Sequence, residues 1–295
     1  FILLRLAAYG LFGLALILYF VVVYFVGQAG AALHEYVRVG IWIVALILPF
    51  PLVKLFREYV LYVIKIGHVA VIVRFALHGD LPEGVSQVAW GKEQVMKRFK
   101  ETSVLFVVDR LVAGVINAIN GMMRAMGNML SGVPGVGGMV RLAQGVLRFS
   151  LTYVDEAVLA RNFFKEGETV WESAKTGLVL YAQTWREILK TALVLGIAAL
   201  VGYGVLLVLF LIPALGLGGA YPSIKIPAVI AAFILAAVLK LALLDPWALT
   251  NMILLYIHET KDLAPNAEWE NKLAKVSAKF RRIQQQAASA LPSSI

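Results

Sequence analysis

Two charged residues interrupt the apolar stretch 226–257. Lys240 lies about 14 residues into this stretch, and Asp245 follows five residues later, directly before Pro246. A charge inside a hydrocarbon layer costs roughly 2.5 to 3.5 kcal/mol on insertion scales, so such residues usually face protein or water. The pair has two interpretations: an ion or proton site at a broken helix, or a structural arrangement. In the structural arrangement, Lys240 pairs with Asp245 or Asp155, or extends its amine to the membrane surface.

Polar side chains also recur along two apolar stretches in the middle of the chain. They repeat every three or four residues, which places each set on one face of a helix. The two stretches are joined by the glycine-rich turn 132–138. The polar positions are Arg110, Asn117, Asn120, Arg124 and Asn128 in the first stripe and Arg141, Gln144, Arg148 and Asp155 in the second.

A row of Arg and Asn in apolar surroundings is suited to two different roles. It can line a hydrated path or bind an anionic headgroup. It can instead hold two helices, or neighbouring copies of the chain, together through hydrogen bonds worth on the order of 1 kcal/mol each. The two stripes are therefore candidates for a polar path or for an assembly surface.

A third set of candidates lies directly after the second apolar stretch. Lys54, Arg57, Lys65 and His68 fall on one side of a regular α-helix, among Val, Ile and Leu. This pattern predicts a basic amphipathic helix lying along the inner leaflet near anionic headgroups. A further membrane crossing over 59–77 is the alternative.

The sequence lacks the common catalytic and cofactor motifs. It contains no Cys, no HExxH, no GxSxG and no phosphate-binding loop that ends in Gly-Lys-Ser/Thr. The turn 132–138 does not follow a predicted strand, so it is not a dinucleotide-binding fingerprint. The four His residues have no metal-ligand spacing. We therefore predict no enzyme activity, no cofactor and no metal site.

The elements that carry these residues are predicted to be membrane helices. Hydrophobic residues make up 60% of the chain and charged residues 15%, and the mean hydropathy is +0.81. This composition excludes an ordinary soluble domain and predicts an all-α polytopic integral membrane protein. The first apolar run is longer than a signal-peptide core, so we expect a retained span. The four predicted transmembrane helices, in two hairpins, are 6–26, 39–56, 192–211 and 226–257.

The positions of the basic residues predict the orientation. The short loops inside the two hairpins contain only Arg38 and Lys225, whereas 17 of the 27 Lys and Arg residues lie between 54 and 190. Cytoplasmic segments carry the excess of basic residues, so both termini and the midsection are expected on the cytoplasmic side. We expect the membrane to be a prokaryotic inner (plasma) membrane, with the amphipathic helices on its cytoplasmic face.

The chain is thus expected to have four parts. The C-terminal part is predicted to be an amphipathic helix over 266–289, capped by Asn266, with a basic side opposite an apolar seam. The seam residues are Leu273, Val276, Phe280 and Ile283. The four parts are transmembrane hairpin 1 (1–56), an amphipathic helical midsection (57–190), transmembrane hairpin 2 (191–258) and a cytoplasmic basic amphipathic tail (259–295).

Polar groups in apolar surroundings lead us to expect a transport or channel-type protein, with a polar path lined by the striped helices. The alternative is a non-catalytic oligomeric membrane scaffold, or an accessory subunit of a larger membrane complex. Expected partners are membrane lipids, including anionic headgroups, and further subunits, most simply copies of the same chain. Nucleic acid is not expected. In a membrane protein, Lys and Arg gather on the cytoplasmic side, so a net charge of +9 does not by itself indicate a nucleic-acid partner.

Three strings have the density of distinctive residues that is typical of family motifs. They are YVDEAVLARNFF (153–164), LVLYAQTWREILK (178–190) and LLDPWALTNMILLYIHET (243–260). We attach no named family to them.

Overall fold

The structure is a computed structural model that describes residues 1–31, 34–97, 107–108, 110–118, 121, 153–163 and 167–290, without the side chains of 57–59. These residues form helices and connecting turns, with no strand among them. The chain divides into two compact units. Unit 1 consists of Phe1–Ile66 and Ala199–Pro246, and unit 2 of Gly67–Ala198 and Trp247–Ile295.

Four helical segments are long and apolar enough to cross a membrane, judged by length and composition. They are α1 (Ile2–Ala31), the segment Glu35–Leu55, α8 (Val170–Ala220) and the segment Pro222–Thr260. The predicted all-helical class and the predicted number of long apolar helices are confirmed for the described residues. Each segment is longer than its predicted span, because the helical backbone continues beyond the predicted apolar run at one or both ends.

The second apolar segment is divided by proline. Helix α2 (Glu35–Ile47) ends before Pro49, which occupies the N-cap position of the short helix α3 (Phe50–Leu55). Pro51 occupies the first turn of α3, where a missing backbone N–H costs nothing. The chain then continues through the π-helical turn η1 (Phe56–Leu61) into α4 (Tyr62–His78).

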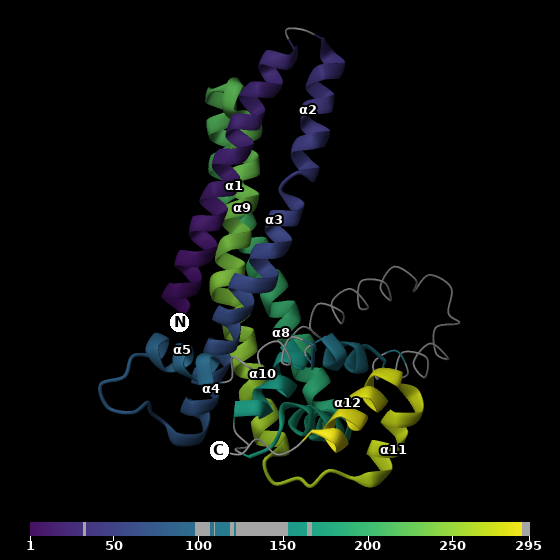
Figure 1. The fold of residues 1–295 in the computed structure, drawn as a ribbon. Helices are drawn as coiled ribbons and strands as arrows, with labels where there is room; N and C mark the ends of the chain where they lie inside the picture. The colour runs from purple at the N-terminus through teal and green to yellow at the C-terminus, as the bar shows by residue number, and fades with distance from the viewer. Residues whose placement is uncertain are drawn as a thin grey trace, which may run out of the picture. The chain divides into compact units, whose positions relative to one another are not determined.

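In unit 1, α1 packs against both α2 and α9 (Lys225–Leu239), as Figure 1 shows. The indole of Trp42 in α2 lies directly against Gly27 in α1. Further along the pair, the Tyr19 hydroxyl donates a 3.1 Å hydrogen bond to the Ala45 carbonyl. Small residues allow this close approach, which is the usual way in which helices pack in a membrane.

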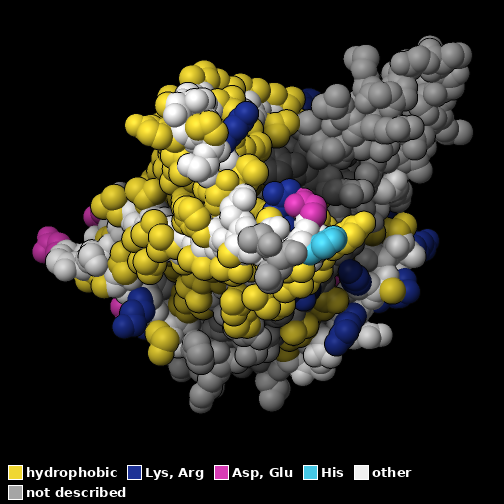
Figure 2. Space-filling view, turned by 90° about the horizontal axis from the view of Figure 1, so that it is seen from above, with side chains coloured by type: hydrophobic (Ala, Val, Ile, Leu, Met, Phe, Trp, Pro, Cys, Tyr) yellow, Lys and Arg dark blue, Asp and Glu magenta, His cyan; other side chains and the backbone are white. Residues whose placement is uncertain are grey.

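Unit 1 carries many of its large apolar side chains on the outside. Leu3, Leu11, Phe50 and Ile212 are 80%, 73%, 71% and 66% exposed. Figure 2, which draws the whole chain, shows hydrophobic side chains over much of the described surface in that view, with charged side chains scattered among them. Soluble proteins rarely expose apolar area of this extent, so the surface of unit 1 is suited to apolar surroundings.

Unit 2 has the opposite organisation, with a closed hydrophobic core. It contains α4 from Gly67 onward, α5 (Gln87–Lys97), helical residues 110–118 and 153–160, α8 up to Ala198, and α10 (Asp245–Thr260) from Trp247 onward. The C-terminal helices α11 (Ala267–Val276) and α12 (Ala278–Ser289) complete it. Its largest fully buried side chains are Tyr181, Tyr256, Phe280, Ile116, Leu178, Leu180, Ile188, Leu249, Met252 and Ile253.

The possible third crossing at 59–77 corresponds to α4, which is not one of the four long apolar helices. Five consecutive residues from Val69 to Val73 are buried, which requires protein on every side of the helix there. Val69, Ile72 and Val73 belong to the core of unit 2.

The C-terminal segment forms two helices, so the prediction of one helix over 266–289 was wrong. Ser277 has an extended backbone (φ −133°, ψ 112°) and divides the segment into α11 and α12. The predicted cap at Asn266 is confirmed, since its side chain accepts a 2.7 Å hydrogen bond from the Glu268 N–H. The break turns Leu273, Phe280 and Ile283 into the core but leaves Val276 45% exposed.

Candidate functional site

Lys240 and Asp245 form an ion pair in unit 1. The ammonium Nζ lies 2.9 Å from Oδ1 and 3.0 Å from Oδ2 of the carboxylate. The two side chains are 16% and 20% exposed, so the pair is largely enclosed. Because opposite charges at this distance leave no net charge, the pair is much easier to accommodate in an apolar layer than either residue alone.

A π-helical turn brings the two side chains together. On a regular α-helix, residues five apart point about 140° away from each other. Residues Lys240–Leu244 instead form the π-helical segment η4, and the Asp245 N–H donates to the Lys240 carbonyl, five residues back. Pro246 accounts for this, because it has no N–H for the Ala242 carbonyl and its ring disfavours a regular helix there. Turns of this kind often occur at functional sites.

The polar stripe of the first helix is described in part. Arg110 and Asn117 are exposed and Gly114 is half-buried. Asn120, Arg124, Asn128, Arg141, Gln144 and Arg148 lie outside the described residues. The opposite face packs into the core through Val108, Leu111, Val112, Val115 and Ile116. Where it is described, the stripe is thus the outer face of a helix whose other faces are buried.

The C-terminal helix α12 reaches this stripe. The end of the Lys279 side chain lies where a Cβ atom would stand on Gly114, so the missing side chain of Gly114 makes room for the lysine. In the second stripe, Asp155 is half-buried, and its Oδ1 accepts a 3.0 Å hydrogen bond from the Glu156 N–H. The described part of the first stripe therefore contacts the protein's own C-terminal segment.

The predicted basic face is not continuous in the structure. Lys54 is exposed, whereas His68 is only 8% exposed. The prediction assumed a regular α-helix from Lys54 to His68, but η1 inserts a π-helical turn at Phe56–Leu61. This extra residue shifts the angular position of everything that follows it, so His68 does not share an exposed face with Lys54. Lys65 is half-buried and lies 5.5 Å from the Tyr62 ring, and the Arg57 side chain lies outside the described ones.

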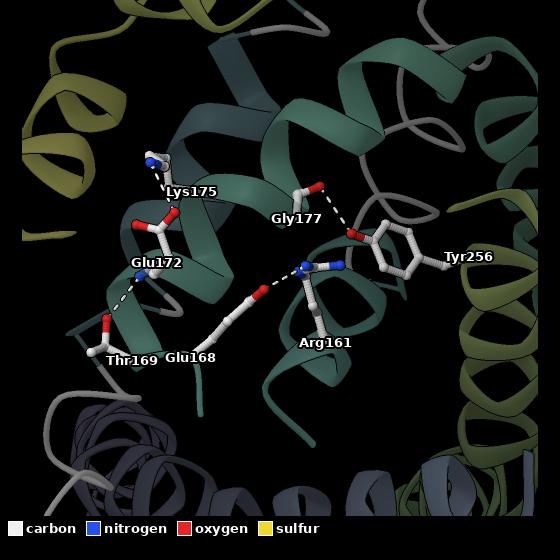
Figure 3. A network of polar contacts seen from close by, with 7 residues as sticks. All are labelled: Arg161, Glu168, Thr169, Glu172, Lys175, Gly177 and Tyr256. Atoms are coloured by element: carbon white, nitrogen blue, oxygen red, sulfur yellow. Dashed lines mark hydrogen bonds and ion pairs between the residues drawn. The ribbon is translucent and has the colours of Figure 1, made fainter. Parts of the chain in front are cut away.

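A polar network that the sequence did not single out lies inside unit 2 (Figure 3). Arg161, only 5% exposed, comes from the 3-10 turn η2 (Arg161–Phe163). Its Nη2 atom lies 2.8 Å from Oε1 of Glu168, whose side chain is 27% exposed. A largely buried arginine is stable only with such a partner, so this ion pair fixes η2 against the start of α8.

The start of α8 continues this network. The Thr169 hydroxyl accepts a 3.1 Å hydrogen bond from the Glu172 N–H, and the Glu172 carboxylate pairs with Lys175 at 3.0 Å. These contacts satisfy an otherwise free N–H of the first turn. In Figure 3, Tyr256 lies on the other side of Arg161 from Glu168, and its hydroxyl donates a 3.0 Å hydrogen bond to the Gly177 carbonyl.

Two deeply buried acceptors adjoin this network in sequence. Asn162 is 1% exposed and donates through Nδ2 to the Leu159 carbonyl, while its Oδ1 has no hydrogen-bond partner. The Ser173 hydroxyl oxygen is also buried without a partner. Among the described residues, no three His, Asp or Glu side chains are grouped to hold a metal ion. The chemistry available here is hydrogen bonding and charge pairing.

The structure brings the three motif-like strings together in the core of unit 2. Val158 comes from the first string, Tyr181 from the second and Tyr256 from the third, and all three belong to one hydrophobic cluster. The density of distinctive residues was the sequence signal for this network, but it did not show which residues pair. Comparison of the chain with protein-family models, curated proteins and solved structures gives no match.

Proposed function

We propose that the chain is an integral membrane protein of the transport or channel class, in which the Lys240–Asp245 pair is the ion-responsive site. The observation that carries this proposal is a charged pair at a π-helical turn within the long apolar segment Pro222–Thr260. Ionisable residues inside apolar membrane segments are rare and mark ion or proton pathways.

The surface of unit 1 supports insertion into a membrane. Its long helices expose large apolar side chains such as Leu11 and Ile212, which lipid tails would cover. We propose two transmembrane hairpins, with both termini on the cytoplasmic side, because the basic residues are concentrated outside the two short loops. A prokaryotic inner membrane fits this distribution.

The proposed mechanism is an exchange of partners at Asp245. A proton or metal cation that binds the carboxylate removes the charge that holds the Lys240 ammonium. Lys240 must then turn toward water or an anion, and the adjacent break at Pro246 allows the two helical segments to change their angle. The exposed Arg110 and Asn117 are proposed to contribute the polar surface of the solute path.

Flux measurements in proteoliposomes test this proposal. We expect wild-type protein to conduct ions or small solutes above the lipid background, and Lys240→Met or Asp245→Asn to abolish the flux. The exchanged variant K240D/D245K keeps an ion pair but swaps the positions of the two charges. If this variant folds but shows no flux, the function requires the lysine at 240 and the aspartate at 245. Lys190→Met, at an exposed lysine, is the matched control.

The scaffold function predicts a different set of results. Background flux from wild-type protein, across a panel of ions and small solutes, would overturn the transport proposal. The mass of the detergent-solubilised particle then tests the alternative, because a scaffold requires an oligomer or a larger complex. A monomer without flux would contradict both functions.

A further inference from the structure

The helical hairpin α11–α12 is a folded part of unit 2 that uses its apolar side internally. Leu273, Phe280 and Ile283 are at most 1% exposed and belong to the hydrophobic core. Polar contacts hold the two helices together: Gln284 donates to Glu270 at 2.9 Å, and Arg281 donates to the Ala274 carbonyl at 2.6 Å.

The loop that leads into this hairpin is also fixed. The side-chain amide of Gln183 donates to the Ala264 carbonyl at 3.2 Å and accepts from the Asn266 N–H at 3.0 Å. The hairpin is therefore packed against the rest of unit 2, and three of the four residues of its apolar seam, Leu273, Phe280 and Ile283, are not available for insertion into a membrane.

The outer face of the hairpin is strongly basic. Only two acidic residues, Glu268 and Glu270, lie between 267 and 289, and Glu268 is paired with Lys272 at 2.6 Å. Five cations against two acids leave an excess of three positive charges. The exposed cations are Lys272, Lys275, Lys279, Arg281 and Arg282.

We propose that this basic face of α11–α12 binds anionic lipid headgroups through charge alone, without inserting apolar side chains. The inference depends on membrane insertion of the long apolar helices but not on transport. Such helices keep the hairpin close to a bilayer, which raises the local concentration of headgroups. Each Lys or Arg near an anionic surface increases association about five-fold, and Arg side chains can bind phosphate through two parallel hydrogen bonds.

The absence of insertion gives the proposal a specific signature. An amphipathic helix that inserts its apolar face remains bound at high salt, because burial of apolar surface does not depend on ionic strength. Binding through charge alone weakens as salt shortens the range of electrostatic attraction. The α11–α12 face should therefore associate with headgroups reversibly and in a strongly salt-dependent way.

The full chain in lipid nanodiscs provides the test. The chain contains no Cys, so Gln285→Cys introduces a single thiol on the exposed side of α12 for a fluorophore. We expect headgroup-located quenchers to act strongly in discs that contain phosphatidylglycerol and weakly in pure phosphatidylcholine, with the difference lost at high salt. Quenchers deep in the acyl chains should have little effect in either disc.

Charge variants complete the experiment. The triple variant K275Q/K279Q/R282Q should lose most of the phosphatidylglycerol-dependent quenching, whereas K92Q/K97Q/K190Q, with the same net charge, should retain it. Equal quenching in the two lipids, equal loss in the two triple variants, or strong quenching by deep probes would each overturn the proposal. RNA or an acidic protein that binds this face while phosphatidylglycerol has no effect would also overturn it. The quenching measurement does not depend on transport, so its result could be interpreted even if the transport proposal failed.

Discussion

The hydroxyl of Tyr256 donates a 3.0 Å hydrogen bond to the carbonyl oxygen of Gly177, which lies 79 residues earlier in the chain. Both residues are in the core of unit 2, and Tyr256 has no exposed surface. The bond joins the last part of α10 to the first part of α8, two helices that also belong to the long apolar segments. Removing this bond therefore measures how much one contact between α8 and α10 contributes to the stability of unit 2.

Tyr256→Phe should lower the free energy of unfolding by about 1 kcal/mol, because it removes one buried hydrogen bond and keeps the ring. Equilibrium unfolding in detergent micelles would measure this change. Tyr221→Phe is the control, since Tyr221 is 61% exposed and its hydroxyl remains accessible to water. Equal effects of the two substitutions would mean that the bond to Gly177 does not contribute.

Alanine at Gly177 and at Gly114 should have opposite effects. A Cβ atom on Gly177 would lie 3.1 Å from the Tyr256 hydroxyl and 3.3 Å from the Val158 carbonyl oxygen, which is backbone and cannot move easily. We expect a loss of about 1 to 3 kcal/mol from overpacking. At Gly114 only the flexible end of Lys279 must move, so the gain of up to about 1 kcal/mol in helix propensity should prevail. Thermal unfolding of both variants would compare them, and destabilisation at Gly114 would contradict the prediction.

The Arg161–Glu168 pair should show strong coupling in a double-mutant cycle. Arg161→Leu alone should cost about 3 kcal/mol, because it leaves a largely buried carboxylate without its partner. Adding Glu168→Leu should recover part of this loss, since no charge is then left unpaired. The exposed pair Lys190–Glu187 is the control and should couple by less than about 1 kcal/mol. Additive losses at Arg161 and Glu168 would contradict a direct interaction.

The long apolar helices were predictable because length and hydropathy suffice to identify them. The π-helical turns at Phe56–Leu61 and Lys240–Leu244 were not, since each adds one residue to a turn while leaving composition and hydropathy unchanged. The turn at Phe56–Leu61 altered the prediction of one basic face, because His68 is buried whereas Lys54 is exposed. The turn at Lys240–Leu244 brought Asp245 to Lys240, which is one of the two pairings that the sequence left open.

The polar network around Arg161 could not be derived from periodicity. Its partner Glu168 lies seven residues away, beyond the end of η2, so no helical spacing relates the two side chains. The contact between Lys279 and Gly114 is likewise long-range, and only tertiary packing determines it. The break at Ser277 has the same origin, because turning Phe280 into the core outweighs one more residue of regular helix.

Acidification should loosen the start of α11. The hydrogen bond from Lys272, together with its charge, lowers the pKa of the Glu268 carboxyl below the usual 4.5. Because the folded-state pKa is depressed, the pair stabilises the helix above the unfolded pKa, and this contribution is lost as the pH falls through the folded pKa. Hydrogen exchange of residues 267–276, corrected for intrinsic rates, should show declining protection below pH 4.5. Glu268→Gln should flatten the response, and an identical pH profile would exclude Glu268 as its source.

Ser277→Ala should destabilise the C-terminal hairpin by about 1 kcal/mol. The Ser277 hydroxyl accepts a 3.3 Å hydrogen bond from the Phe280 N–H in the first turn of α12, and alanine leaves this buried donor without a partner. Because Phe280 and Ile283 enter the core only if α12 begins at this point, the loss should appear as faster exchange throughout 278–289. Ser289→Ala, at the exposed end of the same helix, should change neither exchange nor unfolding. If both substitutions had the same small effect, the position of the break would have to be set by packing of Phe280 and Ile283 rather than by the cap.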